Sequence, residues 1–289
     1  MKILINCTGF IGDILFSTSV ADKIKSEQEV HTLDYLIHLY QPYTLLSNDP
    51  NIDNVYLFDC DKTKYDKIIE LNYIDFSYTP TEYYQTQSGI KNTSPEYYVH
   101  TIPSFDQSVK HTLKPYKDIG KIIVAYMRNW EERSFLFTEE EYKQGIDVPN
   151  LGYGGKHRNI DFIIQHLSED PNIMLLPIGM EPGFNVKEAD FQNTADYTMQ
   201  ASLLKSCDYF IGAEGGLCNL AAGVGCKTII TGDFIHQLYG WNGVLRKINN
   251  PKLGPKHYFN DKDKHITLNP YLTDKQVIIN IKQIINDRF

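Results

Sequence analysis

The stretch from Ser206 to Gly225, SCDYFIGAEGGLCNLAAGVG, constrains the fold of this chain more than any other. Tyr209 to Ile211 reads as a short apolar strand, the chain then turns through glycines, and a small-residue helix begins near Leu217. Such a turn exposes the first free N–H groups of the helix and the positive end of its dipole. Glycines there let an anion approach the backbone. The stretch therefore predicts either an anion site, suited to the diphosphate of a sugar nucleotide, or an ordinary strand–turn–helix unit whose glycines serve packing.

The composition is that of a globular protein and excludes several other classes. With 289 residues, 42% of them hydrophobic and 22% charged, the chain can form two modest domains or one large one and is unlike a disordered protein. A net charge of -8 excludes a uniformly basic surface for nucleic acid, but a local basic groove stays open. The five cysteines are odd in number and lack CxxC spacing, which argues against a disulfide framework and a zinc site. We therefore expect a cytoplasmic protein, and no apolar run approaches the roughly 20 residues that a membrane span needs.

The order of the predicted elements indicates an α/β chain with two similar halves. Expected strands are 2–6, 33–39, 55–58, 121–126, 173–178, 208–211 and 227–231, and expected helices are 14–25, 43–46, 160–167, 201–206, 217–224 and 274–286. The α/β rhythm continues less regularly through 65–71 and 73–78, is absent from 79–120 and restarts at Lys121, so we expect domains at 1–115 and 116–289 with a linker at 110–120. The amphipathic helix 274–286 is expected to pack across onto a domain face.

A second glycine turn follows the first strand and carries an acidic residue. It reads Thr8-Gly9-Phe10-Ile11-Gly12-Asp13, where Gly9 and Gly12 permit a tight turn and Asp13 stands at or just before a helix N-terminus. As an N-cap, Asp13 would contribute about 1 kcal/mol. As a general base at the mouth of a cleft, it would take the proton of an acceptor hydroxyl. Its position alone favours the cap.

The same turn also resembles the end of the glycine fingerprint in extended short-chain dehydrogenases, which would imply an NAD(P) site. Asn6 or Cys7, depending on the spacing, stands where the first glycine of that fingerprint belongs. The Tyr-x-x-x-Lys pairs begin at Tyr258 and Tyr271, too near the C-terminus for the catalytic pair of that family. This alternative is therefore disfavoured.

The two glycine turns together resemble the heptosyltransferase-like glycosyltransferases of family 9. The N-terminal pattern of that family is a strand, Gly-Asp and a helix with small and hydroxyl residues, and this chain reads IGDILFSTSVADKIK. The C-terminal signature is a strand, Asp-Ser/Thr-Gly, two residues, His and Leu-x-Ala-Ala, and this chain reads AEGGLCNLAAGVGCKTIITGD. The resemblance implies the GT-B fold, with two Rossmann-like domains facing across a cleft. The acceptor would then bind to 1–115 and the nucleotide-sugar donor to 116–289.

The resemblance also implies an enzyme of the hexosyl or heptosyl transferase type. It would move a sugar from a nucleotide-diphosphate sugar to a hydroxyl of a glycan or lipopolysaccharide-type acceptor, with inversion and without a metal or a cofactor. Asp13 matches the base of the family, and Thr8, Gly9 and Gly12 would lie beside the acceptor. The backbone N–H groups near Gly215, Gly216 and Leu217 would stabilise the departing nucleoside diphosphate.

The donor half should also supply cations and an acidic residue. A glycine-rich loop, 152–158, lies roughly where the family carries a donor-contacting lysine, so Lys156 is the first candidate and Arg158 the second. Arg128, just after the strand 121–126, is a third candidate, and Glu181 is expected near the nucleoside. A solvated loop or turn is the alternative interpretation for all of them.

Two positions depart from the family signature. Glu214 replaces its aspartate, which keeps the charge and adds a methylene, and Asn219 replaces its histidine. Asparagine cannot become a cation near neutral pH, so any proton or charge role of that histidine is lost, although a hydrogen bond to a sugar or phosphate remains open. The donor sugar would then differ from heptose, or the protein would be a non-catalytic nucleotide-sugar binder.

Two further features each have a purely structural and a functional interpretation. The triplets Asp59-Cys60-Asp61 and Asp261-Lys262-Asp263 could hold a cation, but a turn is favoured for the first and a solvated loop for the second. The lysine-rich stretches 110–121 and 247–265 are expected to be solvated. If they lined one cleft, the acceptor would be a phosphorylated glycan or the modified bases of DNA, as for a virus-encoded transferase. Contact with nucleic acid or with a membrane surface is left open, and the sequence predicts no oligomeric state.

Overall fold

A computed structural model of the whole chain supplies the structure. It describes the stretches 1–9, 11–72, 80–94, 96–127, 159–179, 197–212, 215–231, 265–268 and 272–287.

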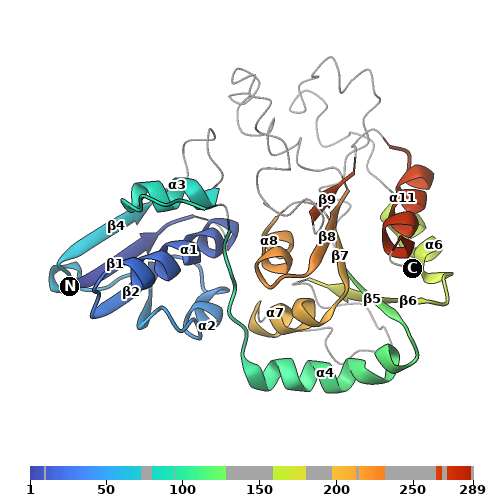
Figure 1. Cartoon of the computed structure of the whole chain (residues 1–289), viewed down its shortest axis with the longest axis horizontal. Helices are drawn as coiled ribbons and strands as arrows, with labels where there is room; N and C mark the ends of the chain where they lie inside the picture. Colours follow the sequence, from blue (N-terminus) through green and yellow to red (C-terminus); the bar gives the residue numbers. More distant parts are fainter. Residues whose placement is uncertain are drawn as a thin grey trace, which may run out of the picture.

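The first half contains a four-stranded parallel sheet with the order β3-β2-β1-β4 (Figure 1). Its elements are β1 Lys2–Cys7, α1 Ile11–Glu27, β2 Thr32–Ile37, α2 Tyr43–Leu46, β3 Asn54–Leu57, the 3-10 helix η1 Lys62–Lys64, β4 Lys67–Leu71 and α3 Pro80–Gln87. Parallel strands that are covered on both faces read as continuous apolar runs, and the buried residues 3–7 of β1 fit this rule. α1 contacts β1 and β2, and α3 packs beside it against β4.

The second half contains a five-stranded parallel sheet with the order β6-β5-β7-β8-β9. Its elements are α4 Pro103–Asp118, β5 Ile122–Met127, α6 Ile160–Ser168, β6 Ile173–Ile178, α7 Tyr197–Ser206, β7 Tyr209–Gly212, α8 Gly216–Gly223, β8 Lys227–Ile230, β9 His265–Thr267 and α11 Asp274–Asn286. Figure 1 shows α7 and α8 on one face of this sheet and α6 and α11 on the other. The predicted α/β class with two parallel, Rossmann-like sheets is thus confirmed.

The two halves share an apolar boundary. α1 contacts α8, and α2 contacts α7, so the helices on the inner face of each sheet pack against each other. Phe16 of α1 and Leu217 of α8 belong to one buried cluster that continues into both sheets. The chain crosses between the halves as an extended segment, residues 96–102, which we call the crossing segment (Figure 1).

Two sequence expectations about the boundary need correction. Of residues 110–120, expected to be a linker, 110–118 form the second half of α4, because Val109 and Leu113 are buried one turn apart while Lys110, Lys114 and Lys117 face solvent. The helix α11, expected to pack across onto a domain face, packs against α6 within its own half. The domain limits at 115 and 116 stay a prediction.

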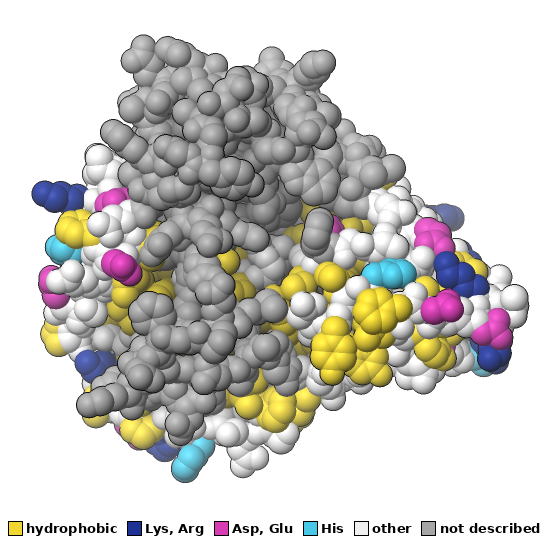
Figure 2. Space-filling view, turned by 180° about the vertical axis from the view of Figure 1, so that it is seen from behind, with side chains coloured by type: hydrophobic (Ala, Val, Ile, Leu, Met, Phe, Trp, Pro, Cys, Tyr) yellow, Lys and Arg dark blue, Asp and Glu magenta, His cyan; other side chains and the backbone are white. Residues whose placement is uncertain are grey.

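None of the helices in the described stretches combines the length and the apolar character that crossing a membrane demands. On the face shown in Figure 2, the lysines and arginines of the described residues stand among acidic side chains and form no continuous basic groove.

Candidate active site

The N-terminal ends of α1 and α8 meet at the boundary between the two halves. A Cβ atom built on Gly12 would lie 2.5 Å from Asn219 Nδ2, and one built on Gly216 would lie 3.2 Å from Ile11 Cγ2. Gly12 therefore allows an approach that any side chain would obstruct. Because the N-terminus of a helix presents unpaired N–H groups and a partial positive charge, two such ends side by side favour an anionic ligand. The structure thus brings together the two glycine turns that the sequence singled out.

Asp13 lies at this junction, half-buried in the first turn of α1. α1 begins at Ile11, so Asp13 is not the N-cap that its position favoured, although its charge still suits the helix dipole. Tyr84 of α3 donates a hydrogen bond from Oη to Asp13 Oδ1 at 3.1 Å. A Cβ atom on Gly9 would lie 2.4 Å from Asp13 Cβ and 2.6 Å from Oδ2, so the turn leaves no room for a side chain at position 9. The Tyr84 hydroxyl therefore orients the carboxylate, and the Gly9 turn lies close beside it.

Cys7, at the end of β1, has a buried thiol close to this turn. Burial and, to a smaller extent, the negative charge of Asp13 raise the pKa of its thiol to about 12, and hydrogen bonding with the Gly9 backbone and Ser17 only partly opposes this. The thiol therefore stays protonated near neutral pH and does not act as a nucleophile.

Asn219 is buried in α8 with an incomplete set of hydrogen bonds. Its side-chain Oδ1 accepts no hydrogen bond from the part of the chain that the structure describes. A buried polar atom without a partner costs about 1–3 kcal/mol. A hydroxyl of a ligand at the junction could donate to Oδ1 and remove that cost, whereas a diphosphate, which has only acceptor oxygens, could not. The role of Asn219 at the donor stays a prediction.

The crossing segment contacts the same part of α8. Tyr97 donates a hydrogen bond from Oη to the backbone oxygen of Asn219 at 2.6 Å. Its ring packs edge-on against Phe16 of α1, with centroids 4.9 Å apart. Tyr97 thereby ties α1 to α8 next to the junction.

The turn before α8 has the backbone that its glycines predict. Gly215, the N-cap, has φ 155° and ψ -172°, a region that essentially only glycine occupies. Its carbonyl accepts the first helical hydrogen bond from Asn219 N at 2.9 Å. Gly215 and Leu217 are buried and Gly216 is half-buried. The N–H groups of the first turn of α8 therefore lie close to the Asp13 turn.

The remaining assigned residues are spread more widely. Thr8 is exposed, and its hydroxyl donates to Asn72 Oδ1 at 2.6 Å beside β4. The other donor-site residues lie outside the described stretches, so their roles stay predictions; they are Arg128, Lys156, Arg158, Glu181 and Glu214.

The Asp59-Cys60-Asp61 triplet lies in the irregular stretch between β3 and η1. Asp59 Oδ1 accepts from the N–H of Cys60 at 2.8 Å. Asp61 caps η1 by accepting from Thr63 N at 3.2 Å and forms an ion pair with Lys64 at 3.3 Å. Both carboxylates thus have local partners, and the turn interpretation stays a prediction. The second triplet, 261–263, lies outside the described residues.

Sequence reasoning missed Tyr84 and Tyr97. Each is an aromatic residue in a region without periodicity, and each meets its partner across a separation of 71 and 122 residues, respectively. No local pattern marks such a contact, so only covariation between the two positions could have revealed it.

No protein-family model matches this chain, and no curated protein matches its sequence. Solved structures do match. A glycosyltransferase of family 9 from Veillonella parvula superposes with a TM-score of 0.60, at 12% identity over 99% of this chain and 97% of the other. The E. coli ADP-heptose lipopolysaccharide heptosyltransferase II superposes with a TM-score of 0.61, at 10% identity over 100% and 99% of the two chains. The chain has the GT-B fold of glycosyltransferase family 9.

The family 9 fold is also that of TibC from enterotoxigenic E. coli, described as an iron-containing dodecameric glycosyltransferase. It superposes with a TM-score of 0.58 at 13% identity over 100% of this chain and 77% of the other. Identities this low establish the fold, and the activity has to be argued from the site.

Proposed function

We propose that this protein is a glycosyltransferase that moves a sugar from a nucleotide-diphosphate sugar to an acceptor hydroxyl. The observation that carries the proposal is the position of Asp13, a fixed carboxylate where the N-terminal ends of α1 and α8 converge. Sugar transfer needs a base for the acceptor and a stabilised diphosphate leaving group. The junction offers a candidate for each, on opposite halves of the chain.

In the proposed reaction, Asp13 takes the proton of the acceptor hydroxyl, and the oxygen attacks the anomeric carbon of the donor. The bond from that carbon to the diphosphate oxygen breaks on the opposite face, so the configuration inverts. The leaving diphosphate carries the released electron pair, and we assign its stabilisation to N–H groups of Gly215, Gly216 and Leu217 rather than to a metal. The hydrogen bond from Tyr84 would hold the carboxylate toward the acceptor without neutralising it.

The choice of substrates rests on the site and on the fold together. A sugar on the diphosphate would lie near Asn219, whose buried Oδ1 can accept a hydrogen bond from a sugar hydroxyl. We propose a glycan or lipopolysaccharide-type acceptor on the first half, beside Gly9, Gly12 and Thr8. The ADP-heptose lipopolysaccharide heptosyltransferase with the same fold supports this class of substrate.

The test begins with a thermal-shift screen of nucleotide sugars against the full chain. A ligand that binds only the folded state raises Tm. At a ligand concentration of one hundred times Kd, it adds about 2.7 kcal/mol to the free energy of unfolding. A panel in which no nucleotide sugar raises Tm would contradict the donor site.

The second step separates catalysis from binding. Asp13→Asn should retain the donor-induced shift in Tm and lose most of the turnover of donor to free nucleotide in the presence of acceptor. Asp118→Asn, on the exposed face of α4, is the matched control and should keep both. Equal turnover in Asp13→Asn and wild type would refute Asp13 as the base. If nucleotide sugars raise the Tm of wild type but wild type shows no turnover, the protein is a non-catalytic nucleotide-sugar binder. Asn219 in place of the family histidine is the feature that suggests this alternative.

A further inference from the structure

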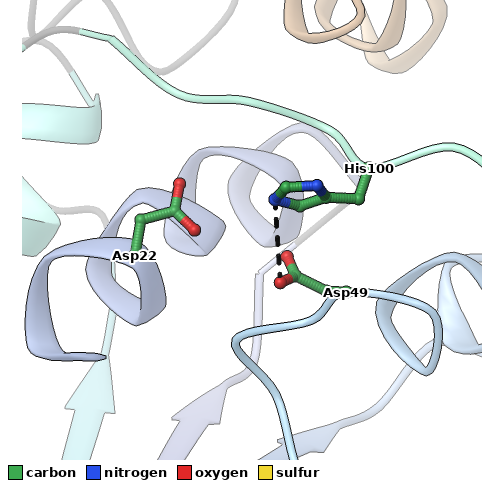
Figure 3. A group of neighbouring side chains, drawn as sticks. All are labelled: Asp22, Asp49 and His100. Atoms are coloured by element: carbon green, nitrogen blue, oxygen red, sulfur yellow. Dashed lines mark ion pairs between the residues drawn. The ribbon is translucent and has the colours of Figure 1, made fainter. Parts of the chain in front are cut away.

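Asp22, Asp49 and His100 meet in a cluster that the proposed reaction does not use (Figure 3). They come from α1, from the loop between α2 and β3, and from the crossing segment, respectively. One ligand atom from each lies within 4.8 Å of the others, and His100 Nε2 is 3.9 Å from Asp49 Oδ1. Asp22 follows Asp13 on the same helix at a distance of about 13 Å along its axis, so the cluster is separate from the junction.

The negative charge of the two carboxylates is poorly compensated. The side chain of Asp49 is 3% exposed, and that of Asp22 is partly buried. Within the described stretches, no lysine or arginine forms an ion pair with either residue. Buried charges in proteins are ordinarily paired with an opposite charge or bound to a metal.

One residue orients both carboxylates. Asn51 donates its backbone N–H to Asp49 Oδ1 at 2.8 Å and its side-chain Nδ2 to Asp22 Oδ1 at 2.6 Å. Metal-binding carboxylates are commonly held by such outer hydrogen bonds, which fix the direction of the ligand atoms. Figure 3 shows the His100 ring over Asp49, with the Asp22 carboxylate on the other side of the space between them.

We propose that Asp22, Asp49 and His100 bind one divalent cation of the zinc or manganese type. Two carboxylate oxygens and one imidazole nitrogen suit these ions, and their bonds of about 2.0–2.2 Å place neighbouring ligand atoms roughly 3.4 Å apart in a tetrahedral site. A contraction of up to about 1.4 Å would therefore complete the site, and the half-exposed side of His100 leaves a position for water. The charge of the cation would balance both carboxylates.

Such an ion would fasten the crossing segment to the first half. His100 follows Tyr97 and Val99, which contact α8, so the cation would stiffen the link between the halves. The proposal does not depend on glycosyltransferase activity, since an inactive protein with this fold would bind the ion equally.

The direct test is equilibrium dialysis of the chelator-treated full chain against ZnCl₂ and, separately, MnCl₂, with the bound metal measured by mass spectrometry. Wild type should bind one equivalent of at least one of the two ions. Asp22→Asn and His100→Gln should each weaken that binding at least tenfold. The matched controls are Asp118→Asn and His111→Gln on the exposed face of α4, which should bind as wild type does. The controls keep all five cysteines, so metal held by thiols would survive in every variant and would refute the assignment.

A second measurement separates a metal site from a purely structural cluster. Without metal, Asp22→Asn should have a higher Tm than wild type at pH 7, because one of two neighbouring buried negative charges is gone. Adding the bound ion should raise the Tm of wild type and leave that of Asp22→Asn unchanged. Absence of binding to wild type at 100 µM metal, or an equal rise of Tm in both proteins, would overturn the proposal.

Discussion

Replacing Gly223 by alanine tests whether the crossing segment lies against α8 as the structure has it. Gly223 is the last residue of α8, and a Cβ atom there would lie 2.5 Å from Val99 Cγ2 and 2.8 Å from Tyr97 Cε2. Val99 N also donates to the Gly223 carbonyl at 2.9 Å, and Tyr97 Oη donates to Asn219 O at 2.6 Å. The segment is therefore held at the place where the new methyl group must go.

The sign of the change in the free energy of unfolding shows whether the space beside Gly223 is open or filled by the crossing segment. In an unobstructed helix, glycine to alanine stabilises by up to about 1 kcal/mol. Overpacking a filled site costs about 1–3 kcal/mol, and the two hydrogen bonds at risk contribute about 1 kcal/mol each. We therefore expect Gly223→Ala to lower the free energy of unfolding by about 1–2 kcal/mol.

The assay is urea unfolding, compared through the midpoint and the slope. Val99→Ala removes the methyl group nearest to the new Cβ, so the double variant should be about 1 kcal/mol more stable than the sum of the single changes predicts. Gly225→Ala is the control: its φ of 82° makes alanine strained, but no atom lies within 4 Å, so Val99→Ala should not rescue it. A rise in the midpoint for Gly223→Ala, or strict additivity with Val99→Ala, would refute the packing described here.

Two further predictions concern Asp13 and Asp22. Tyr84→Phe removes the hydroxyl that donates to Asp13, so kcat should fall about 3–10-fold with donor affinity unchanged, whereas full activity would exclude Tyr84 from the site. The pKa of Asp22 is raised to about 6, so its protonated form is favoured by folding. The free energy of unfolding of metal-free wild type should therefore fall by about 1–2 kcal/mol as the pH rises from about 4 to 6, after allowance for the exposed part of the side chain. Asp22→Asn should not show this fall, and parallel curves of Tm against pH for the two proteins would contradict the prediction.

Local structure could be predicted closely wherever the signals are local. The bounds of α2, β6 and α11 are those expected from the sequence. For α11, Thr273 and Gln276 form a capping box, and the buried positions follow helical periodicity. The stretch that became α4 was misjudged because only Val109 and Leu113 are buried among many lysines, which hides the period of the helix.

The sequence by itself determined the two glycine turns, the strand-to-helix units around them and, through their resemblance to family 9, the fold. These features depend on neighbours along the chain, where steric limits and periodicity act directly. Only the tertiary structure decided that Gly12 faces Asn219, that Tyr84 holds Asp13, and that the crossing segment brings His100 to a pair of carboxylates. Such contacts join distant segments, and their geometry follows from how the two sheets and their helices pack, which no short stretch of sequence encodes.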